Sequence, residues 1–593
     1  MFQSADRCVI IKNIYAMTGE IFLKKLLVYM KEYIKESILG PLFKLLEALL
    51  ELFVPMVVAA VIDKGIAAGD RDYIVKMCLV LVLLGFVGLA FSITAQFFTA
   101  KASVGFTARL RYVLFRHIQG LSYSELDELG TSTMITRMTS DMNQVQNGVN
   151  LTLRLLLRSP FVVFGAMIMA FTINVRAAMI FVYVTILLLI VVFAIMLASI
   201  PLYKKVQQRL DAVTSVTREN LTGVRVIRAF CREEEETQRF TAANSELTRS
   251  QEFVGRISAL MNPVTYIIIN LGIIFLINRG AVSVEQGVLT QGAVVALYNY
   301  MSQILVELIK LANLIINITK SIACGNRIQA VLEMTPSVTD GQGGHHENEY
   351  AVELRKASLR YKNAAEDSLS SIDLAVKKGE TVGIIGGTGS GKSSLVNLIP
   401  RFYDVHSGEV LVNGVNVKCC DVSELRSKIG IVPQKAVLFK GTIRENLLWG
   451  NENASDDDLL KAAKAAQAID VINAKGGLDG EIEQGGRNLS GGQRQRLTIA
   501  RALVRKPEIL ILDDSASALD FATDAALRKS LRELDYSPSV FIVSQRTSSI
   551  MHADKIIVLD DGEAVGIGTH NELLEGCEVY REIFNSQFKK EAV

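Results

Sequence analysis

The sequence lacks an excess of charge of either sign, and it is poor in cysteine. Its 593 residues include 63 Lys and Arg against 61 Asp and Glu, so it has no overall basic field of the kind that favours nucleic-acid binding. The seven cysteines are dispersed and form no CxxC pair; only Cys419 and Cys420 are neighbours. This pattern predicts neither disulfides nor a zinc site, and it fits a reducing compartment.

The N-terminus also lacks the pattern of a secretory signal peptide. Its apolar stretches are interrupted by Lys12, Lys24 and Lys25, and no small-residue cleavage pattern follows them. Met17 opens a segment that looks like a natural start of the chain, so we expect residues 1–16 to be a start-site extension.

Apolar residues are abundant: they make up 50% of the chain, and the mean hydropathy is +0.30. A membrane-spanning helix needs about 20 mainly apolar residues. Six segments meet this requirement: 38–63, 75–99, 153–174, 177–200, 257–279 and 291–317. The connections 100–152 and 201–256 are long, helical in pattern and rich in Lys and Arg, so the positive-inside rule places them and both termini in the cytoplasm. We expect these connections to continue the membrane helices as stalks.

The sixth segment carries polar residues on one helical face: Asn299, Gln303, Glu307, Lys310, Asn313 and Asn317. The first segment repeats this theme with Lys44, Glu47 and Glu51. Lipid does not solvate such groups, so the face must contact protein or a water-filled cavity. The groups either join helices, with Glu307 and Lys310 paired, or line a translocation cavity. We favour the cavity, for which Asn299, Gln303, Glu307 and Lys310 are the candidates.

The pattern of the chain changes after Met334. Residues 335–350 form a polar linker, in which His345 and His346 are interpreted as solvated residues rather than ligands. From Ala351 onward, strands and helices alternate. We therefore divide the chain into an N-terminal segment and elbow (1–36), a transmembrane domain (37–333), a linker (334–350) and an α/β domain (351–593).

A phosphate-binding motif lies near the start of the α/β domain. A short apolar strand, Val382–Ile385, precedes the loop Gly386, Gly387, Thr388, Gly389, Ser390, Gly391, Lys392, Ser393 and Ser394. This GxxxxGKS pattern between a strand and a helix lets backbone N–H groups surround the phosphates of ATP. Lys392 is expected to reach the β- and γ-phosphates, and Ser393 to bind Mg²⁺. A second apolar strand, 509–512, ends in Asp513, a further Mg²⁺ ligand.

Between these motifs stands Leu489-Ser490-Gly491-Gly492-Gln493, which resembles the signature of the ABC ATPases. By the same resemblance, Tyr361 is the aromatic residue that stacks on adenine, Gln434 is the Q-loop glutamine at Mg²⁺, and 517–520, ending in Asp520, is the D-loop. Segments 133–137 and 219–223 look like the intracellular loops of type IV ABC exporters.

The resemblance implies a multidomain fold. A six-helix, all-α transmembrane domain with long cytoplasmic helical stalks is fused to an α/β P-loop ABC ATPase domain with a helical subdomain. In this family two ATPase domains enclose two nucleotides, so the working unit is a dimer. The signature residues Ser490, Gly491, Gly492 and Gln493 then act on ATP bound by the partner chain. Fusion of the two domains favours export.

Two positions depart from the family pattern. Asp514 replaces the glutamate that acts as general base, and its shorter side chain withdraws the carboxylate by about 1 Å, enough to cost about a hundredfold in rate. Gln545 replaces the switch histidine and carries no transferable charge. Together they resemble the degenerate-site subunit of heterodimeric bacterial multidrug exporters.

We therefore expect this protein to lie in the cell membrane and to bind ATP and Mg²⁺, but to hydrolyse ATP poorly at its own site. Its partner would be a second half-transporter that carries the catalytic Glu and the switch His. The transported substrate would be a small amphipathic drug, lipid or peptide. The alternatives are a slow homodimeric exporter and an ATP-gated channel. A soluble ABC ATPase would lack the six apolar spans, and a peptidase-containing exporter would need more residues before the first span.

Overall fold

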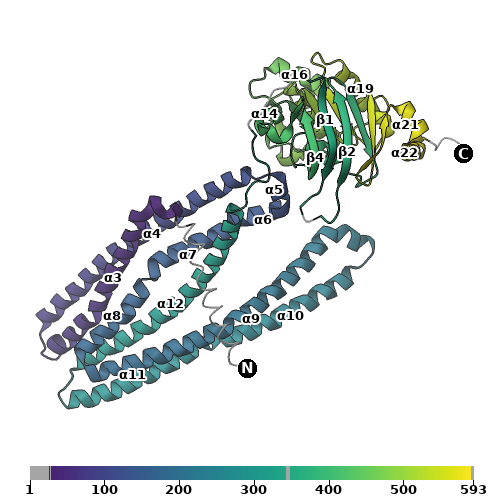
Figure 1. Ribbon diagram of the computed structural model, residues 1–593. Coiled ribbons are helices and arrows are strands. Elements are labelled where there is room, and N and C mark those ends of the chain that lie inside the picture. The colour runs from purple at the N-terminus through teal and green to yellow at the C-terminus, as the bar shows by residue number, and fades with distance from the viewer. Residues whose placement is uncertain (1–25, 27, 342, 344–347, 363, 589–593) are drawn as a thin grey trace. The chain divides into compact units, whose positions relative to one another are not determined.

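The computed structural model describes residues 26, 28–341, 343, 348–362 and 364–588 (Figure 1). Residues 1–16, for which a start-site extension is predicted, and the linker residues His345 and His346 lie outside this range. The chain divides into two compact units. The first extends to Ile118 and continues over Ser132–Glu333, and the second comprises Gln119–Thr131 and the chain from Met334 onward. The short segment Gln119–Thr131 lies within the range predicted for the transmembrane domain, but it belongs to the second unit.

The described part of the first unit is helical. Its elements are η1 (Val28–Tyr33), α3 (Ile34–Ala60), η2 (Val61–Ile66), α4 (Arg71–Gln119), α6 (Thr131–Thr136), η3 (Arg137–Asp141), α7 (Met142–Leu155), α8 (Arg158–Ile173), α9 (Val175–Ala229), α10 (Glu233–Ala259), α11 (Met261–Glu285) and α12 (Gln291–Leu332). Among the described residues, six helical stretches are long and apolar enough to cross a membrane, and each contains one of the six predicted spans to within one residue. The predicted spans 153–174 and 177–200 are separated at Asn174, whose side chain accepts a hydrogen bond from the Ala177 N–H at 3.0 Å and begins α9.

The longest helices extend well beyond a bilayer. At 1.5 Å per residue, the 55 residues of α9 span roughly 80 Å, whereas the hydrocarbon core is about 30 Å thick. Helix α10, which is about half as long, packs antiparallel beside part of α9 (Figure 1). The predicted continuation of membrane helices into long helical stalks is thus confirmed.

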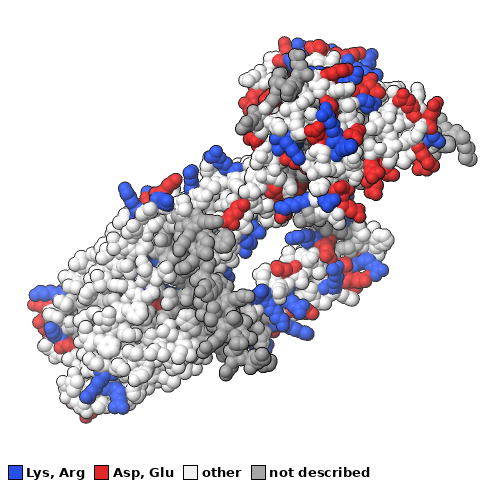
Figure 2. Space-filling model, in the orientation of Figure 1, with Lys and Arg blue, Asp and Glu red and all other residues white. Residues whose placement is uncertain are grey.

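The first unit exposes apolar side chains as a membrane protein does. Along α4, large apolar side chains are 54–68% exposed at successive turns: Val75, Leu79, Val82, Leu83, Phe86, Leu89, Ile93 and Phe97. A soluble protein rarely exposes so continuous an apolar face, whereas lipid tails solvate it. Figure 2 shows the corresponding surface as a broad area with few charged residues, while both signs of charge are mixed over the second unit. The protein is therefore a multi-pass membrane protein.

The second unit contains two main sheets. The first has the order β2-β1-β4-β5, with β1 (Tyr350–Leu359), β2 (Leu369–Lys377), β4 (Ser407–Val412) and β5 (Val415–Asn416). The second has the order β12-β11-β3-β10-β9-β6, with β3 (Thr381–Gly386), β6 (Ile429–Val432), β9 (Ile509–Asp513), β10 (Ser539–Val543), β11 (Lys555–Asp560) and β12 (Glu563–Gly568). All strands of the second sheet run parallel except β12, which pairs antiparallel with β11.

Helices connect and cover these strands. They are α5 (Tyr123–Leu129), α13 (Lys392–Leu398), η4 (Val417–Cys419), α14 (Val422–Ser427), α15 (Ile443–Leu448), α16 (Asp456–Ala465), α17 (Ile469–Ala474), η5 (Gln484–Gly486), α18 (Gly491–Val504), α19 (Phe521–Arg532), α20 (Thr547–Ile550), α21 (His570–Gly576) and α22 (Glu578–Phe588). The helices between β6 and β9 form the predicted helical subdomain, with a small ribbon of β7 (Gly441–Thr442) and β8 (Glu481–Ile482).

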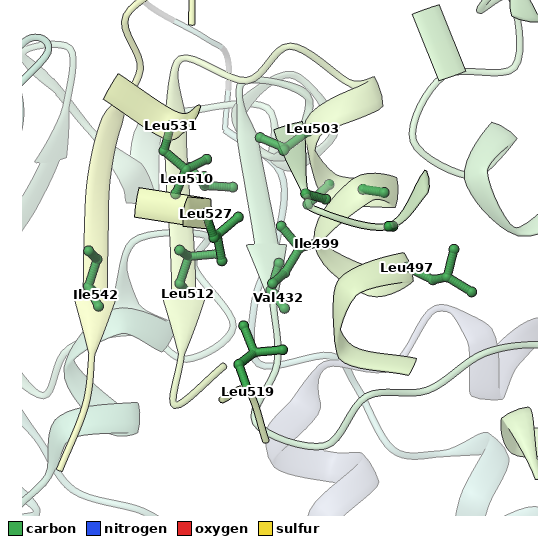
Figure 3. Packing of buried hydrophobic residues seen from close by; sticks show 14 of the residues in the cluster. Val432, Leu497, Ile499, Leu503, Leu510, Leu512, Leu519, Leu527, Leu531 and Ile542 are labelled. Atoms are coloured by element: carbon green, nitrogen blue, oxygen red, sulfur yellow. The ribbon is translucent and has the colours of Figure 1, made fainter. Parts of the chain in front are cut away.

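The parallel register brings distant motifs to one edge of the sheet. Val543 at the end of β10 lies opposite Asp513 of β9 on one side and Ile384 of β3 on the other. Ligand-binding residues gather at the carboxyl ends of such strands. Figure 3 shows the apolar packing that fixes this arrangement, in which Leu510 and Leu512 of β9 lie among side chains of α18 and α19 such as Ile499 and Leu527.

Candidate functional site

The loop between β3 and α13 has the shape that a phosphate-binding loop requires. Gly389 and Gly391 adopt left-handed backbone conformations (φ 88° and 91°), and a Cβ on Gly391 would lie 2.7 Å from the Ser368 carbonyl oxygen. Lys392 begins α13, and its Nζ donates to the carbonyl oxygens of Gly386 (3.0 Å) and Gly387 (2.5 Å). Burial lowers the pKa of Lys392, an effect that the nearby aspartates partly oppose. The ammonium group is therefore held at the loop by two backbone carbonyl oxygens.

A second cluster joins this loop to the end of β9. The Ser393 hydroxyl donates to Oδ1 of Asp513 over 3.0 Å. Asp513 is only 8% exposed, and burial raises the pKa of its carboxyl group. A hydroxyl and a carboxylate brought together from two elements are the hard oxygen donors that Mg²⁺ binds. These two residues therefore fit the predicted Mg²⁺ site, and their distance shows that the two motifs meet in space.

The two departures from the family pattern lie beside this cluster. Asp514 follows β9 in a left-handed conformation (φ 46°), and its Oδ2 accepts a hydrogen bond from Nε2 of Gln434 over 3.4 Å. The backbone carbonyl of Gln545 accepts a hydrogen bond from the Gln587 side chain over 2.7 Å. The structure thus places both substituted residues at the edge of the sheet where the phosphate loop begins.

A cavity of about 700 Å³ opens at this edge. The predicted site residues that line it are Tyr361, Thr388, Gly389, Gly391, Lys392, Ser393, Ser394, Gln434 and Gln545. The cavity is also lined by residues that were not predicted from the sequence: Ala364, Ala365, Glu366, Asp367, Ser368, Asp561 and Gly562. Gly562 (φ 81°) turns the chain between β11 and β12, and its carbonyl accepts from Ser370 N–H at 2.9 Å. The Gly562 turn is visible in the sequence, but its pairing with Ser370 across 192 residues is not.

The signature residues start a helix. Ser490 caps α18: its hydroxyl accepts from the Gln493 N–H over 3.3 Å, and the Gln493 side chain accepts from the Ser490 N–H over 2.9 Å. Among the described residues, none of the four signature residues lines the cavity of the same chain. The space around Gly491 is open: a side chain at this position would meet no atom within 4 Å outside its own helix turn. The start of α18 is thus unpacked at Gly491 within the described chain, whereas a Cβ on Gly492 would lie 2.9 Å from the Ala518 carbonyl oxygen.

Asp520 also occupies a helix start. Its carboxylate accepts from the N–H (2.8 Å) and the hydroxyl (3.0 Å) of Thr523, so it caps α19. Arg546, the neighbour of Gln545, lies over the ring of Phe521 at 5.2 Å and donates to the Leu519 carbonyl. The predicted D-loop is thereby attached to the segment that carries Gln545.

In the first unit, the polar face of α12 is only partly accessible. Glu307 is 3% exposed, and its carboxylate accepts from Arg158 (2.6 Å), Ser159 (2.8 Å) and Lys310 (2.8 Å). The pairing of Glu307 with Lys310 belongs to the helix-joining alternative rather than to the favoured cavity, and the contact with Arg158 was not predicted. Gln303 is half-buried, and its Oε1 has no hydrogen-bond partner within the described chain; Asn299 is also half-buried.

Known protein families match both halves of the chain. Residues 37–308 match the family described as the ABC transporter transmembrane region, and residues 369–517 match the family described as ABC transporter. YfiB of Bacillus subtilis, an uncharacterized ABC transporter ATP-binding protein, is 36% identical over 577 residues, which cover 96% of this chain and 99% of YfiB. An ATP-dependent lipid A-core flippase of Syntrophus aciditrophicus is 32% identical over 496 residues, which cover 82% of this chain and 81% of the flippase.

The fold is similar to that of a bacterial Atm1-family ABC exporter solved with ATP bound. The TM-score is 0.79 at 23% sequence identity, and the match covers 95% of this chain and 99% of the exporter chain. The predicted fold class is therefore confirmed: a six-helix membrane domain is fused to an ATPase domain.

Proposed function

This chain belongs to the ABC transporter family, and from that premise we propose that it is one half of a heterodimeric exporter whose own ATP site binds ATP but hydrolyses it poorly. The observation that carries the proposal is the contrast within one site. The binding group formed by Lys392, Ser393 and Asp513 is complete and assembled, whereas the two positions that serve hydrolysis hold Asp514 and Gln545.

Asp514 supports slow hydrolysis through its reach. A general base must come within hydrogen-bond distance of the attacking water, and the aspartate side chain is one methylene shorter than glutamate. A displacement of about 1 Å can lower the rate by about a hundredfold. The backbone of Asp514 is also held by an N–H donation to the Val543 carbonyl at 3.0 Å, which opposes a compensating shift.

Gln545 supports the same conclusion through its chemistry. It lines the cavity, so its amide is available to donate a hydrogen bond to a terminal phosphate. An amide does not gain or lose a proton near neutral pH, so it provides binding without the transferable charge of a histidine. The site built in this way retains ATP.

Retention of ATP follows from the remaining residues. Backbone N–H groups of the loop and the Lys392 ammonium bind the phosphates, and Tyr361 offers an aromatic face to the base. Ser393 and Asp513, with Gln434, would hold Mg²⁺, which supplies positive charge against the β- and γ-phosphates. The signature residues of this chain would meanwhile complete the hydrolytic site of a partner that carries the catalytic Glu and the switch His.

The transported substrate is proposed to be a small amphipathic compound. Relatives of this chain include proteins named as lipid A-core flippases, and the candidate cavity residues mix charged groups with amides. We place the protein in the cell membrane with both termini in the cytoplasm. Because Asp514 retains a carboxylate, the second candidate is a slow homodimeric exporter.

The test is the ATPase rate of the co-purified pair. Lys392→Ala removes ATP from the degenerate site and should leave a substantial part of the turnover. A Gly491→Gln change at the signature should nearly abolish turnover, because it blocks the partner's ATP. Gly576→Gln, at another open glycine, is the matched control and should have no effect. Equal losses from Lys392→Ala and Gly491→Gln would contradict the heterodimer, and brisk ATP turnover by the purified chain alone would favour the homodimer.

A further inference from the structure

Helix α5 lies on the second unit, although chain segments of the first unit precede and follow it. The ring of Tyr123, the first residue of α5, stacks on Phe402 with a centroid distance of 4.2 Å. Glu125 is 4% exposed and accepts from the Ser337 N–H over 3.3 Å. The preceding residue, Ser122, accepts from the Val338 N–H over 3.0 Å. The start of α5 is thus attached to the ATPase domain by stacking and by hydrogen bonds.

The second half of α5 contacts residues close to the nucleotide cavity. Oδ2 of Asp127 accepts from the Tyr403 hydroxyl over 2.5 Å, and Glu128 forms an ion pair with Lys362 over 2.6 Å. Burial and the bond to Asp127 raise the pKa of Tyr403, so its phenol stays protonated and remains the donor at neutral pH. Lys362 directly follows Tyr361, the residue expected to stack on adenine.

Tyr403 also touches Tyr361 itself. The two rings meet edge to face, with centroids 5.0 Å apart and planes at 87°. The Tyr361 hydroxyl lies 2.9 Å from the Ser394 hydroxyl, and both residues line the cavity with Lys392. A continuous path therefore runs from α5 through Asp127, Tyr403 and Tyr361 to the cavity. Edge-to-face pairs are directional, so the orientation of one ring restrains that of the other.

We propose that Tyr403 is a positioning residue that couples stacking of the ATP base on Tyr361 to the position of α5. This inference rests on the proposed function, in which the base of ATP stacks on Tyr361. A base on the free face of Tyr361 restrains that ring, the ring restrains Tyr403, and the Tyr403 hydroxyl holds Asp127. ATP binding is then transmitted to the helix that leads into the membrane segments, without any hydrolysis. Coupling of this kind is reciprocal, so displacement of α5 weakens binding of the base.

The test is hydrogen exchange of the backbone amides of 122–130 in the full chain in lipid nanodiscs. ATP and inorganic tripolyphosphate are compared at saturating concentration with Mg²⁺, because tripolyphosphate carries the phosphates without the base. ATP should slow exchange in 122–130 by about fivefold or more, at the low end of typical coupling between sites, and tripolyphosphate should not. Tyr403→Phe keeps the ring but loses the bond to Asp127, so most of the ATP-induced protection should disappear.

Three further variants separate positioning from simple packing. Asp127→Asn retains an acceptor oxygen and should keep much of the protection, whereas Asp127→Ala should behave as Tyr403→Phe. Tyr580→Phe removes another buried phenol of the same domain, one that lies 2.7 Å from His570, and should leave protection unchanged. Full protection in both Tyr403→Phe and Asp127→Ala overturns the inference, as does equal protection by tripolyphosphate and ATP. Failure of the unaltered chain to bind ATP would instead overturn the proposed function.

Discussion

The guanidinium group of Arg158 on α8 donates to the carboxylate of Glu307 on α12 over 2.6 Å, with both side chains almost fully buried (7% and 4% exposed). The other amino group of Arg158 donates to Glu51 of α3 over 2.6 Å. One arginine thus joins three membrane helices that are far apart in the sequence. Such a group is stable in a membrane only while its partners compensate its charge.

Removal of Arg158 should therefore destabilise the membrane domain. Arg158→Ala leaves the Glu307 carboxylate buried with Lys310 and Ser159 as its remaining partners, and we expect a loss of about 3–5 kcal/mol, measured by thermal unfolding in nanodiscs. Arg158→Met combined with Glu307→Leu should recover most of it, since no unpaired buried charge remains. Arg232→Ala breaks an ion pair in which both side chains are over 60% exposed and should cost less than about 1 kcal/mol. Equal losses for the two single arginine variants would contradict this account.

The slow site should respond to restoration of its two substituted residues. Asp514→Glu combined with Gln545→His returns a base with full reach and a titratable switch residue. We expect the ATP turnover of this site to rise by about tenfold to a hundredfold, measured as steady-state phosphate release in a background with the partner site inactivated. Asp535→Glu, an exposed substitution of the same kind, is the control. Unchanged turnover in the double variant would show that other residues limit the site.

The buried Asp513 gives a prediction that depends on pH. Burial raises the pKa of the Asp513 carboxyl group above its usual value of 3.8. The protonated carboxyl group therefore stabilises the folded state fully below pH 3.8, and this stabilisation is lost as the pH rises through the folded-state pKa. At neutral pH its charge destabilises the nucleotide-free protein, and Asp513→Asn should raise the Tm. This gain in Tm should shrink as the pH falls toward 4. With Mg²⁺ and ATP present, Asp513→Asn should instead have a lower Tm than the unaltered chain, because the variant lacks a Mg²⁺ ligand. A higher Tm for the unaltered chain without nucleotide at pH 7 would refute this.

The C-terminal helix should control the segment around Gln545. Oε1 of Gln587 on α22 accepts from the N–H (2.9 Å) and hydroxyl (2.8 Å) of Thr547, while its Nε2 donates to the Gln545 carbonyl. Thr547 is fully buried, so Gln587→Ala should cost about 1–3 kcal/mol locally and speed hydrogen exchange at 545–547. Gln587→Glu keeps the acceptor and should lie between Gln587→Ala and the unaltered chain. Ser586→Ala, next to Gln587 on α22, is the matched control and should leave exchange unchanged. Unaltered exchange at 545–547 in Gln587→Ala would show that α22 does not restrain this segment.

The sequence by itself determined the six spans, the phosphate loop and the start of the signature helix. Each depends on neighbours in the chain: about 20 apolar residues make a span, and Ser490 with Gln493 three positions later makes a cap. Strand ends such as Asp513 were equally predictable, because apolar runs set the bounds of buried strands. The roles of Asp514 and Gln545 rest on residue type at a known motif position, and they remain predictions.

Only the tertiary structure decided which distant residues meet. Arg158 was visible as a charge in a predicted span, but its partner Glu307 lies 149 residues further along the chain. The same holds for Asp127 and Tyr403, which are 276 residues apart, and for the assignment of α5 to the ATPase unit. Local periodicity records which face of a helix is polar, but not what that face contacts. Those contacts arise from the packing of whole helices and sheets, in which a buried charge or phenol is stable only opposite the partner that the fold delivers.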